Sequence, residues 1–156
     1  MRWYLLSSSI LRGADFSVNE AGIRDTVRQT ILPLWNSWYF LSLYANAAKA
    51  SGTFDISSDN VLDRYVLAKT HDLIAHVTES MDRYDLFDAC GSVRSFLDAL
   101  TNWYVRRSRD RFWNGDQDAI DTLHTVLVLL TRTLAPLLPL VTEQVYRGLT
   151  GERSVQ

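Results

Sequence analysis

The stretch Asn102–Trp113, NWYVRRSRDRFW, contains four arginines and four aromatic residues. The residues leading into it follow a helical period, because apolar side chains three or four positions apart share one face of an α-helix. That stripe consists of Val93, Phe96, Leu97, Leu100, Trp103 and Tyr104. The stretch is therefore predicted to continue a helix whose one face is buried in a helical core.

The four arginines fall on two different faces of this helix. Arg107 and Arg111 continue the core stripe, so they are predicted to brace the fold by pairing with an aspartate of a neighbouring helix, or to leave the bundle at its edge. Arg106 and Arg109 belong to the opposite face and are predicted to project into water. The arginines therefore form two rows rather than one patch.

The outward row offers the chemistry that RNA requires. It consists of Asn102, Arg106, Arg109 and Trp113. Cations in a line suit phosphates, and an exposed ring suits an unpaired base. A solvated face with salt bridges to Asp98 and Asp110 is the alternative interpretation of the same spacing.

Helical periodicity extends through the rest of the chain, whereas the alternation typical of strands is almost absent. We expect helices at residues 2–6, 17–49, 57–81, 85–113 and 119–134, and a last one that ends at Gly148. Ser17 with Glu20 fits a capping box for the helix over residues 17–49. Asp116 or Asp118 can cap the helix over residues 119–134. The aromatic residues within 33–47 are predicted to be core. The fold class is all-α, an antiparallel bundle of about five helices.

Length and composition narrow the function classes. A chain of 156 residues is one domain, and a formal net charge of −2 argues against binding nucleic acid over the whole surface but allows one basic face. Cys90 is the single cysteine, which fits a reducing cytoplasmic compartment without disulfides. The apolar stretch 123–141 contains Arg132 and two prolines, so it is predicted to be a buried helix pair and not a membrane span.

Catalytic and metal signatures are absent from the sequence. His71 and His76 are five residues apart, whereas helical zinc pairs are three or four apart, and there is no glycine-rich phosphate loop and no Ser–His–Asp pattern. We therefore expect no catalytic residue and no metal site in this chain. Because arginine and aromatic residues are also enriched at protein interfaces, a helical protein-interaction module is an alternative to RNA binding.

Five strings of the sequence together resemble the helical anticodon-binding domain of isoleucyl-tRNA synthetases, which are class I enzymes. The strings are MRWYLLSSSILRGADFS, ILPLWNSWYFLSLYA, DRYVLAKTHDLI, LTNWYVRRSRDRFW and LAPLLPLVTEQVY. The resemblance spans essentially the whole chain. Valyl- and leucyl-type synthetases have similar bundles and form a further alternative, but NWYVRRSRDRFW favours the isoleucyl branch.

The resemblance implies a segment of a longer protein. The parent enzyme would attach isoleucine to its tRNA using ATP with magnesium, and would carry a zinc-binding tail, all outside these residues. Residues 1–16 would end the connection from the catalytic domain, residues 17–150 would form the anticodon-binding bundle, and residues 151–156 a tail. The expected partners are the isoleucine tRNA and the remaining domains, with no membrane, for a monomeric cytoplasmic enzyme.

The resemblance also marks a set of residues for contact with RNA. The basic string of the family maps onto Arg106, Arg107, Arg109 and Arg111, flanked by Asn102 and Trp113. The face analysis ranks Asn102, Arg106, Arg109 and Trp113 as the RNA-binding residues, with Arg107 and Arg111 below them. No cofactor is expected within the chain.

Overall fold

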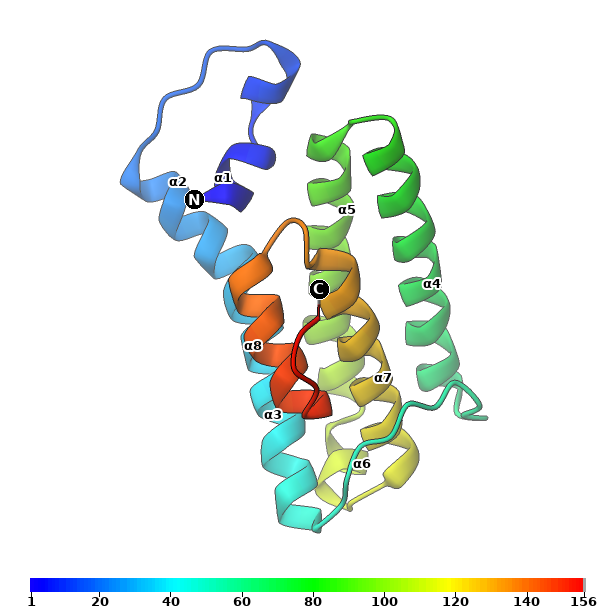
Figure 1. Cartoon of the computed structure of the whole chain (residues 1–156). Helices are drawn as coiled ribbons and strands as arrows, with labels where there is room; N and C mark the ends of the chain where they lie inside the picture. Colours follow the sequence, from blue (N-terminus) through cyan, green and yellow to red (C-terminus); the bar gives the residue numbers. More distant parts are fainter. Residues whose placement is uncertain (156) are drawn as a thin grey trace.

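The computed structural model describes residues 1–155, and all regular structure among them is helical, which confirms the all-α prediction. The elements are α1 (Arg2–Leu6), the 3₁₀ turn η1 (Ser9–Arg12), α2 (Glu20–Thr26), the π-helical turn η2 (Val27–Ile31), α3 (Leu32–Ala48), α4 (Val61–Asp82), α5 (Leu86–Asp98), the π-helical segment η3 (Ala99–Val105), α6 (Arg109–Trp113), α7 (Gln117–Leu134) and α8 (Pro139–Thr150). Figure 1 shows a bundle in which the axes of α3, α4, α5, α7 and α8 are roughly aligned.

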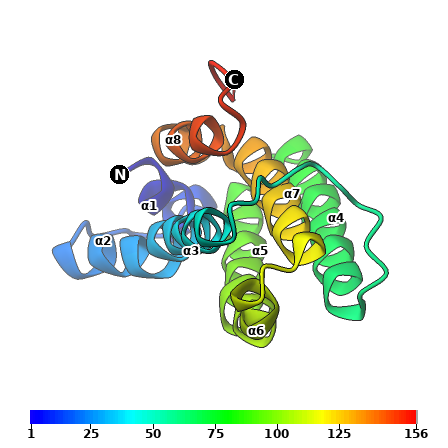
Figure 2. The ribbon, with the colours of Figure 1, turned by 90° about the horizontal axis from the view of Figure 1, so that it is seen from below.

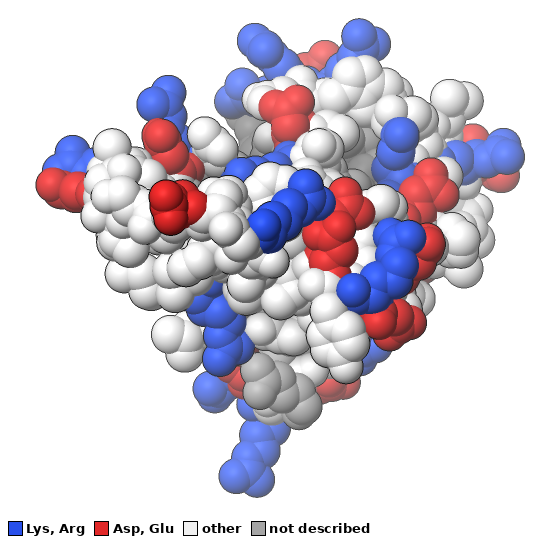
Figure 3. Space-filling model, turned by 90° about the horizontal axis from the view of Figure 1, so that it is seen from above, with Lys and Arg blue, Asp and Glu red and all other residues white. Residues whose placement is uncertain are grey.

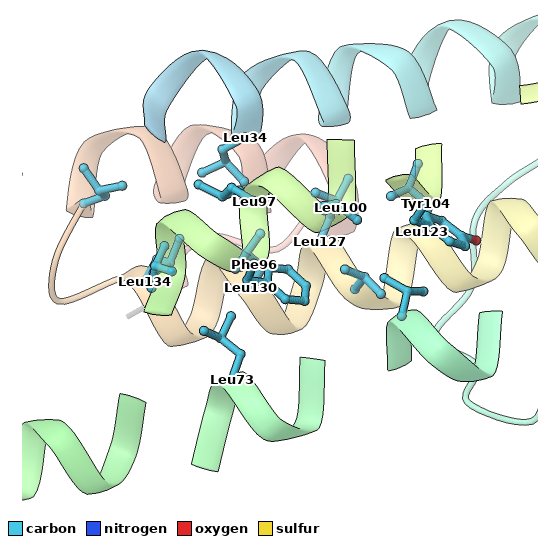
Figure 4. Close-up of a cluster of buried hydrophobic side chains, with 14 of the residues drawn as sticks. Leu34, Leu73, Phe96, Leu97, Leu100, Tyr104, Leu123, Leu127, Leu130 and Leu134 are labelled. Atoms are coloured by element: carbon cyan, nitrogen blue, oxygen red, sulfur yellow. The ribbon is translucent and has the colours of Figure 1, made fainter. Parts of the chain in front are cut away.

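The core lies around α5 and η3, which α3, α4 and α7 surround (Figure 4). The predicted stripe of α5 and η3 is buried, except that Trp103 is only partly covered. The largest aliphatic side chains with almost no exposure are Leu34, Leu97, Leu100, Ile120, Leu123, Leu127, Leu130 and Leu134. Most of them belong to α7, so the first helix of the predicted buried helix pair packs directly into the core. No helix within residues 1–155 is long and apolar enough to cross a membrane.

The predicted helix over residues 17–49 begins later and is interrupted. Asn19 caps α2, because its side-chain oxygen accepts a hydrogen bond of 2.7 Å from the N–H of Gly22, so the predicted capping box at Ser17 is wrong. Tyr4 explains the difference, since its ring lies where a Cβ at Gly22 would sit and its hydroxyl donates to the carbonyl of Ser17. The wide turn η2 comes just before Pro33, which cannot continue a regular α-helix.

The third predicted helix starts at Val61 instead of Ser57 or Ser58. Asn60 caps α4 by accepting from the N–H of Leu62. The hydroxyl of Ser58 donates to Asp63 at 2.8 Å, so it is held inside the fold and does not cap the helix.

The helix predicted over residues 85–113 is divided into three parts. The helix starts near Asp85 as expected, with Asp85 as the cap of α5; η3 follows with its wider turns, and the helix breaks at Ser108 before α6 begins. The break redirects α6, so that Phe112 packs edge-on against Phe40 of α3 with ring centroids 5.0 Å apart. Asp116, one of two predicted caps, begins α7. The last helix extends two residues beyond Gly148 and ends at Gly151, whose φ of 70° is left-handed.

The aromatic residues within 33–47 are core only in part, because three of the five pack against the core as partly buried side chains and two are exposed. Leu34, Ser37 and Leu41 form the buried stripe of α3, whereas Trp35 is 37% exposed and Tyr39 is 62% exposed. The remaining aromatic residues there are partly buried. Because α3 lies at the side of the bundle, only one of its faces meets other helices, and its rings are left at the edges of that face.

Candidate nucleic-acid interface

Arg106 and Arg109 project into solvent at the end of the bundle formed by η3 and α6 (Figures 1 and 2). Both side chains are exposed, as the face analysis predicted, and neither makes a hydrogen bond or ion pair with any part of the chain that the structure describes. Trp113, at the last position of α6, is 78% exposed. These three residues present uncompensated positive charge beside an open ring.

Some exposed cations elsewhere on the surface are neutralised by carboxylates, whereas others, such as Arg28, Arg64 and Arg147, form no ion pair within residues 1–155. Figure 3 shows the opposite end of the molecule, where lysine and arginine side chains alternate with carboxylates. Exposed ion pairs join Arg12 to Asp85 at 3.2 Å, Arg83 to Glu79 at 3.1 Å and Arg24 to Glu20 at 2.6 Å. Such pairs add little stability, but they cancel local charge. The η3–α6 end carries three exposed arginines, Arg106, Arg107 and Arg109, that no carboxylate of residues 1–155 neutralises, although the chain as a whole is acidic.

Arg111 has the structural role that its place in the core stripe predicted. Its guanidinium donates two hydrogen bonds, of 2.7 and 2.8 Å, to the fully buried carboxylate of Asp63 in α4. Its Nε donates to Asp116, the cap of α7, at 2.8 Å. The hydroxyl of Tyr104 donates to the same Asp63 at 2.8 Å. This cluster joins α4, η3, α6 and α7, and it determines where α6 presents Arg109 and Trp113.

The directions of the pKa shifts favour an ionised Arg111, an ionised Asp116 and a neutral Tyr104. The hydrogen bonds to Asp63 raise the pKa of Arg111, and burial, reinforced by Asp63, raises the pKa of Tyr104. Partial burial opposes ionisation of Asp116, but the hydrogen bonds from Arg111 and from the N–H of Ala119 outweigh it and lower the pKa. The stabilisation from the Arg111–Asp116 pair is therefore fully present above the ordinary aspartate pKa and is lost as the pH falls through the lowered value.

Arg107 differs from Arg111, although both continue the core stripe. Its side chain is exposed and pairs with no carboxylate of residues 1–155, so of the two predicted outcomes it follows the second. Its guanidinium carbon lies 5.4 Å from the ring centroid of Trp103. Arg107 thus leaves the bundle at its edge, where a ring holds it without neutralising its charge.

Trp113 borders an open cavity of about 530 Å³ between the ends of α3 and α6. The wall on the α3 side consists of Leu43, Tyr44, Ala47 and Ala48. The rings of Tyr44 and Trp113 are 6.4 Å apart. Sequence analysis missed this wall, because the aromatic segment of α3 had been interpreted as core. The exposed Lys49, which ends α3 with a φ of 53°, follows the wall directly.

Asn102 belongs to a different part of the surface. It is exposed, and its amide nitrogen donates to Asp98 at 2.6 Å. It borders a separate cavity of about 290 Å³ together with Arg28 and Arg94, on the side of η2. The structure therefore brings Arg109 and Trp113 together on α6 and leaves Asn102 outside that group.

The histidines do not form a metal site. His71 lies 3.8 Å from Asp72, and His76 lies 2.8 Å from Asp88. His124, predicted to be an interior hydrogen-bonded residue, is 9% exposed with its Nε2 3.3 Å from the carbonyl of Leu149. Within residues 1–155, no group of three or more His, Cys, Asp or Glu side chains is arranged to hold a metal ion.

The fold and this end of it define an all-α bundle with exposed arginines and an exposed tryptophan at one end, and comparison with known families identifies its class. Residues 63–156 match the family described as the anticodon-binding domain of tRNA ligases. This match covers more than half of the chain. The chain belongs to the anticodon-binding domain family of tRNA ligases.

The similar proteins are isoleucine–tRNA ligases. That of Corynebacterium efficiens is 59% identical over 158 residues, and that of Mycobacterium tuberculosis (strain H37Rv) is 59% identical over 155 residues. The isoleucine–tRNA ligase of Tropheryma whipplei (strain Twist) is 51% identical over 159 residues. Each alignment covers 99% of this chain but only 15% of the relative. The comparisons support the isoleucyl interpretation over a valyl- or leucyl-type domain and over a protein-interaction module.

Proposed function

We propose that this chain binds the anticodon stem and loop of an isoleucine-accepting tRNA through its η3–α6 end. The observation that carries this proposal is the pairing of exposed, unneutralised Arg106 and Arg109 with the 78% exposed ring of Trp113, in a chain of the anticodon-binding family. The arginines would contact phosphates, and the ring would stack on an unpaired base. Asn102 would add a polar contact at the margin of this surface, and Arg111 would act only by holding α6.

The intact protein would be an isoleucine–tRNA ligase that attaches isoleucine to its tRNA with ATP. The chain spans about 15% of the length of the relatives that it matches, so the residues for ATP, magnesium and zinc would lie in the remaining sequence. Residues 1–16 would end the connection from the catalytic domain, residues 17–150 would bind tRNA, and residues 151–156 would form a tail. We further propose a monomer that works in the cytoplasm, with tRNA and its own other domains as partners.

Removing both outward arginines tests the proposed function. In the intact protein, the double variant Arg106→Ala/Arg109→Ala is expected to lower kcat/KM for tRNA charging about tenfold to a hundredfold, because charge-assisted contacts to phosphate are lost. ATP–pyrophosphate exchange driven by isoleucine should persist, since amino-acid activation does not need this surface. Both rates would be measured on the same preparation.

A matched control for that experiment is Arg147→Ala/Arg153→Ala. Both arginines are exposed, Arg147 on α8 and Arg153 in the segment after it. Replacing them removes the same charge as replacing Arg106 and Arg109. This control should charge tRNA at the normal rate. If the two double variants behave alike, the assignment of Arg106 and Arg109 is wrong.

Trp113 provides a separate prediction about stacking. Trp113→Ala is expected to weaken tRNA binding by about 1–3 kcal/mol, the usual cost of losing one base–aromatic stack, whereas Trp113→Phe should retain most of the affinity. Filter binding of the isoleucine tRNA would measure both. Tyr84→Ala is the control, because Tyr84 is 88% exposed at the α4–α5 turn, at the other end of the bundle. Equal affinities for the alanine and phenylalanine variants would show that the ring does not stack.

A further inference from the structure

A row of two rings with a cation at each end crosses from η3 to α4, outside the surface described above. The ring of Trp103 lies 4.5 Å from the ring of Tyr65, centroid to centroid. The guanidinium carbon of Arg107 lies 5.4 Å from the Trp103 centroid, and the Nζ of Lys69 lies 5.8 Å from the Tyr65 centroid. We call these four residues the cation–ring ladder.

The ladder has a regular construction. Arg107 follows Trp103 by four residues, and Lys69 follows Tyr65 by four residues, so each cation lies one helical turn beyond its ring. The helices α4 and α5 pack side by side and, because a short turn joins them, run in opposite directions (Figures 1 and 2). The two cations therefore lie at opposite ends of the ladder, with both rings between them.

A ring positions a cation without cancelling its charge, whereas a carboxylate does both. Arg107 and Lys69 are exposed, and neither forms an ion pair with any residue from 1 to 155. The nearest acid along α4, Asp72, lies 3.8 Å from His71 instead. Tyr65 is 42% exposed and Trp103 is partly buried, so a ligand can reach the ladder at Tyr65 and at both cations. Such an arrangement suits a polyanion whose charges are spaced along a strand.

We propose that the cation–ring ladder is a second phosphate-binding surface, which carries the backbone of the bound RNA from α6 onto α4. Arg107 is exposed at the edge of the bundle and, two residues before α6 begins, forms the end of the ladder nearest to α6 in the sequence. Lys69 holds the far end of the ladder. This inference rests on the proposed tRNA-binding function, and it assigns Lys69 and Tyr65, which sequence analysis did not place in the site, together with Arg107, which it ranked low.

The test uses Lys69→Ala/Arg107→Ala in the intact protein, with Arg147→Ala/Arg153→Ala as the control of equal charge. Affinity for the isoleucine tRNA would be measured across a salt series. The ladder variant is expected to bind roughly tenfold more weakly, with a slope of log K against log salt that is smaller by about 1–2, because about two phosphates lose their cations. The control should retain the wild-type affinity and slope. Unfolding by urea would establish that both variants keep wild-type stability.

A second variant tests the role of the rings. Tyr65→Leu keeps both cations but removes the ring beneath Lys69, so it is expected to weaken binding about threefold, less than removal of the cations. If the ladder variant and the control bind equally while Arg106→Ala/Arg109→Ala binds weakly, the ladder is wrong and the proposed function stands. If the wild-type protein does not bind the tRNA, the proposed function fails and the ladder fails with it.

Discussion

Replacing Asp63 by alanine is expected to destabilise the chain by about 3–5 kcal/mol, because it leaves a charge without its buried partner. The carboxylate of Asp63 is fully buried and accepts two hydrogen bonds from Arg111 and one each from Tyr104 and Ser58. After the substitution, the Arg111 side chain, which is 18% exposed, loses its main acceptor. The hydroxyl of Tyr104 would also remain buried without a partner.

Urea unfolding of the 156-residue chain would measure this loss, with Asp72→Ala as the control. Asp72 is on the same helix, but its side chain is 73% exposed, so its removal should change the free energy of unfolding by less than about 0.5 kcal/mol. The pair Asp63→Leu/Arg111→Met should recover part of the stability, because it removes both charges together. Recovery would be incomplete, since Asp116 would still lack its hydrogen bond from Arg111 and Tyr104 would still lack its acceptor Asp63. A loss below about 1 kcal/mol for Asp63→Ala would contradict the assigned role of the cluster.

Leu97→Ala is expected to cost about 2–5 kcal/mol, as a large-to-small change in a packed core. Leu97 has no exposed surface and lies beside Leu34 of α3, at the centre of the cluster in Figure 4. The neighbouring helices are held by many other contacts and can close the cavity only in part. The loss should appear as a lower urea midpoint with an unchanged slope.

The control for Leu97 is Leu140→Ala, which removes the same atoms from a side chain that is 87% exposed on α8. Its free energy of unfolding should stay within about 0.5 kcal/mol of the wild type. Similar losses for the two leucine variants would mean that α5 is not the centre of the core.

The hydrogen bonds of Asp63 also affect the proposed RNA-binding surface. Asp63 does not reach the solvent, yet it holds Arg111 and therefore the direction of α6. Arg109 and Trp113 depend on that direction for their exposure. The stability of the cluster and the geometry of the proposed RNA surface are thus two consequences of the same hydrogen bonds.

Several features could be predicted from the sequence, because they depend on residues close together in the chain. The period of the apolar residues predicted α5 and its buried stripe, and the same period placed Arg106 and Arg109 in water. An aspartate before a helical run predicted the cap at Asp116, as one of two candidates. The anticodon-binding family was indicated by strings such as NWYVRRSRDRFW, and the comparisons with known proteins confirm it.

Other features depend on residues far apart in the sequence, and only the packed bundle determines them. Arg107 and Arg111 occupy equivalent places in one stripe, but Asp63, 48 positions before Arg111, lies within reach of Arg111 alone. The cavity at Trp113 exists because the end of α3 meets α6, and the cation–ring ladder exists because Tyr65 of α4 meets Trp103. Helical hydrogen bonds span about four residues, so local sequence specifies which face a side chain takes. The partner that it meets on that face depends on how separate helices pack against one another, which a single helical period does not contain.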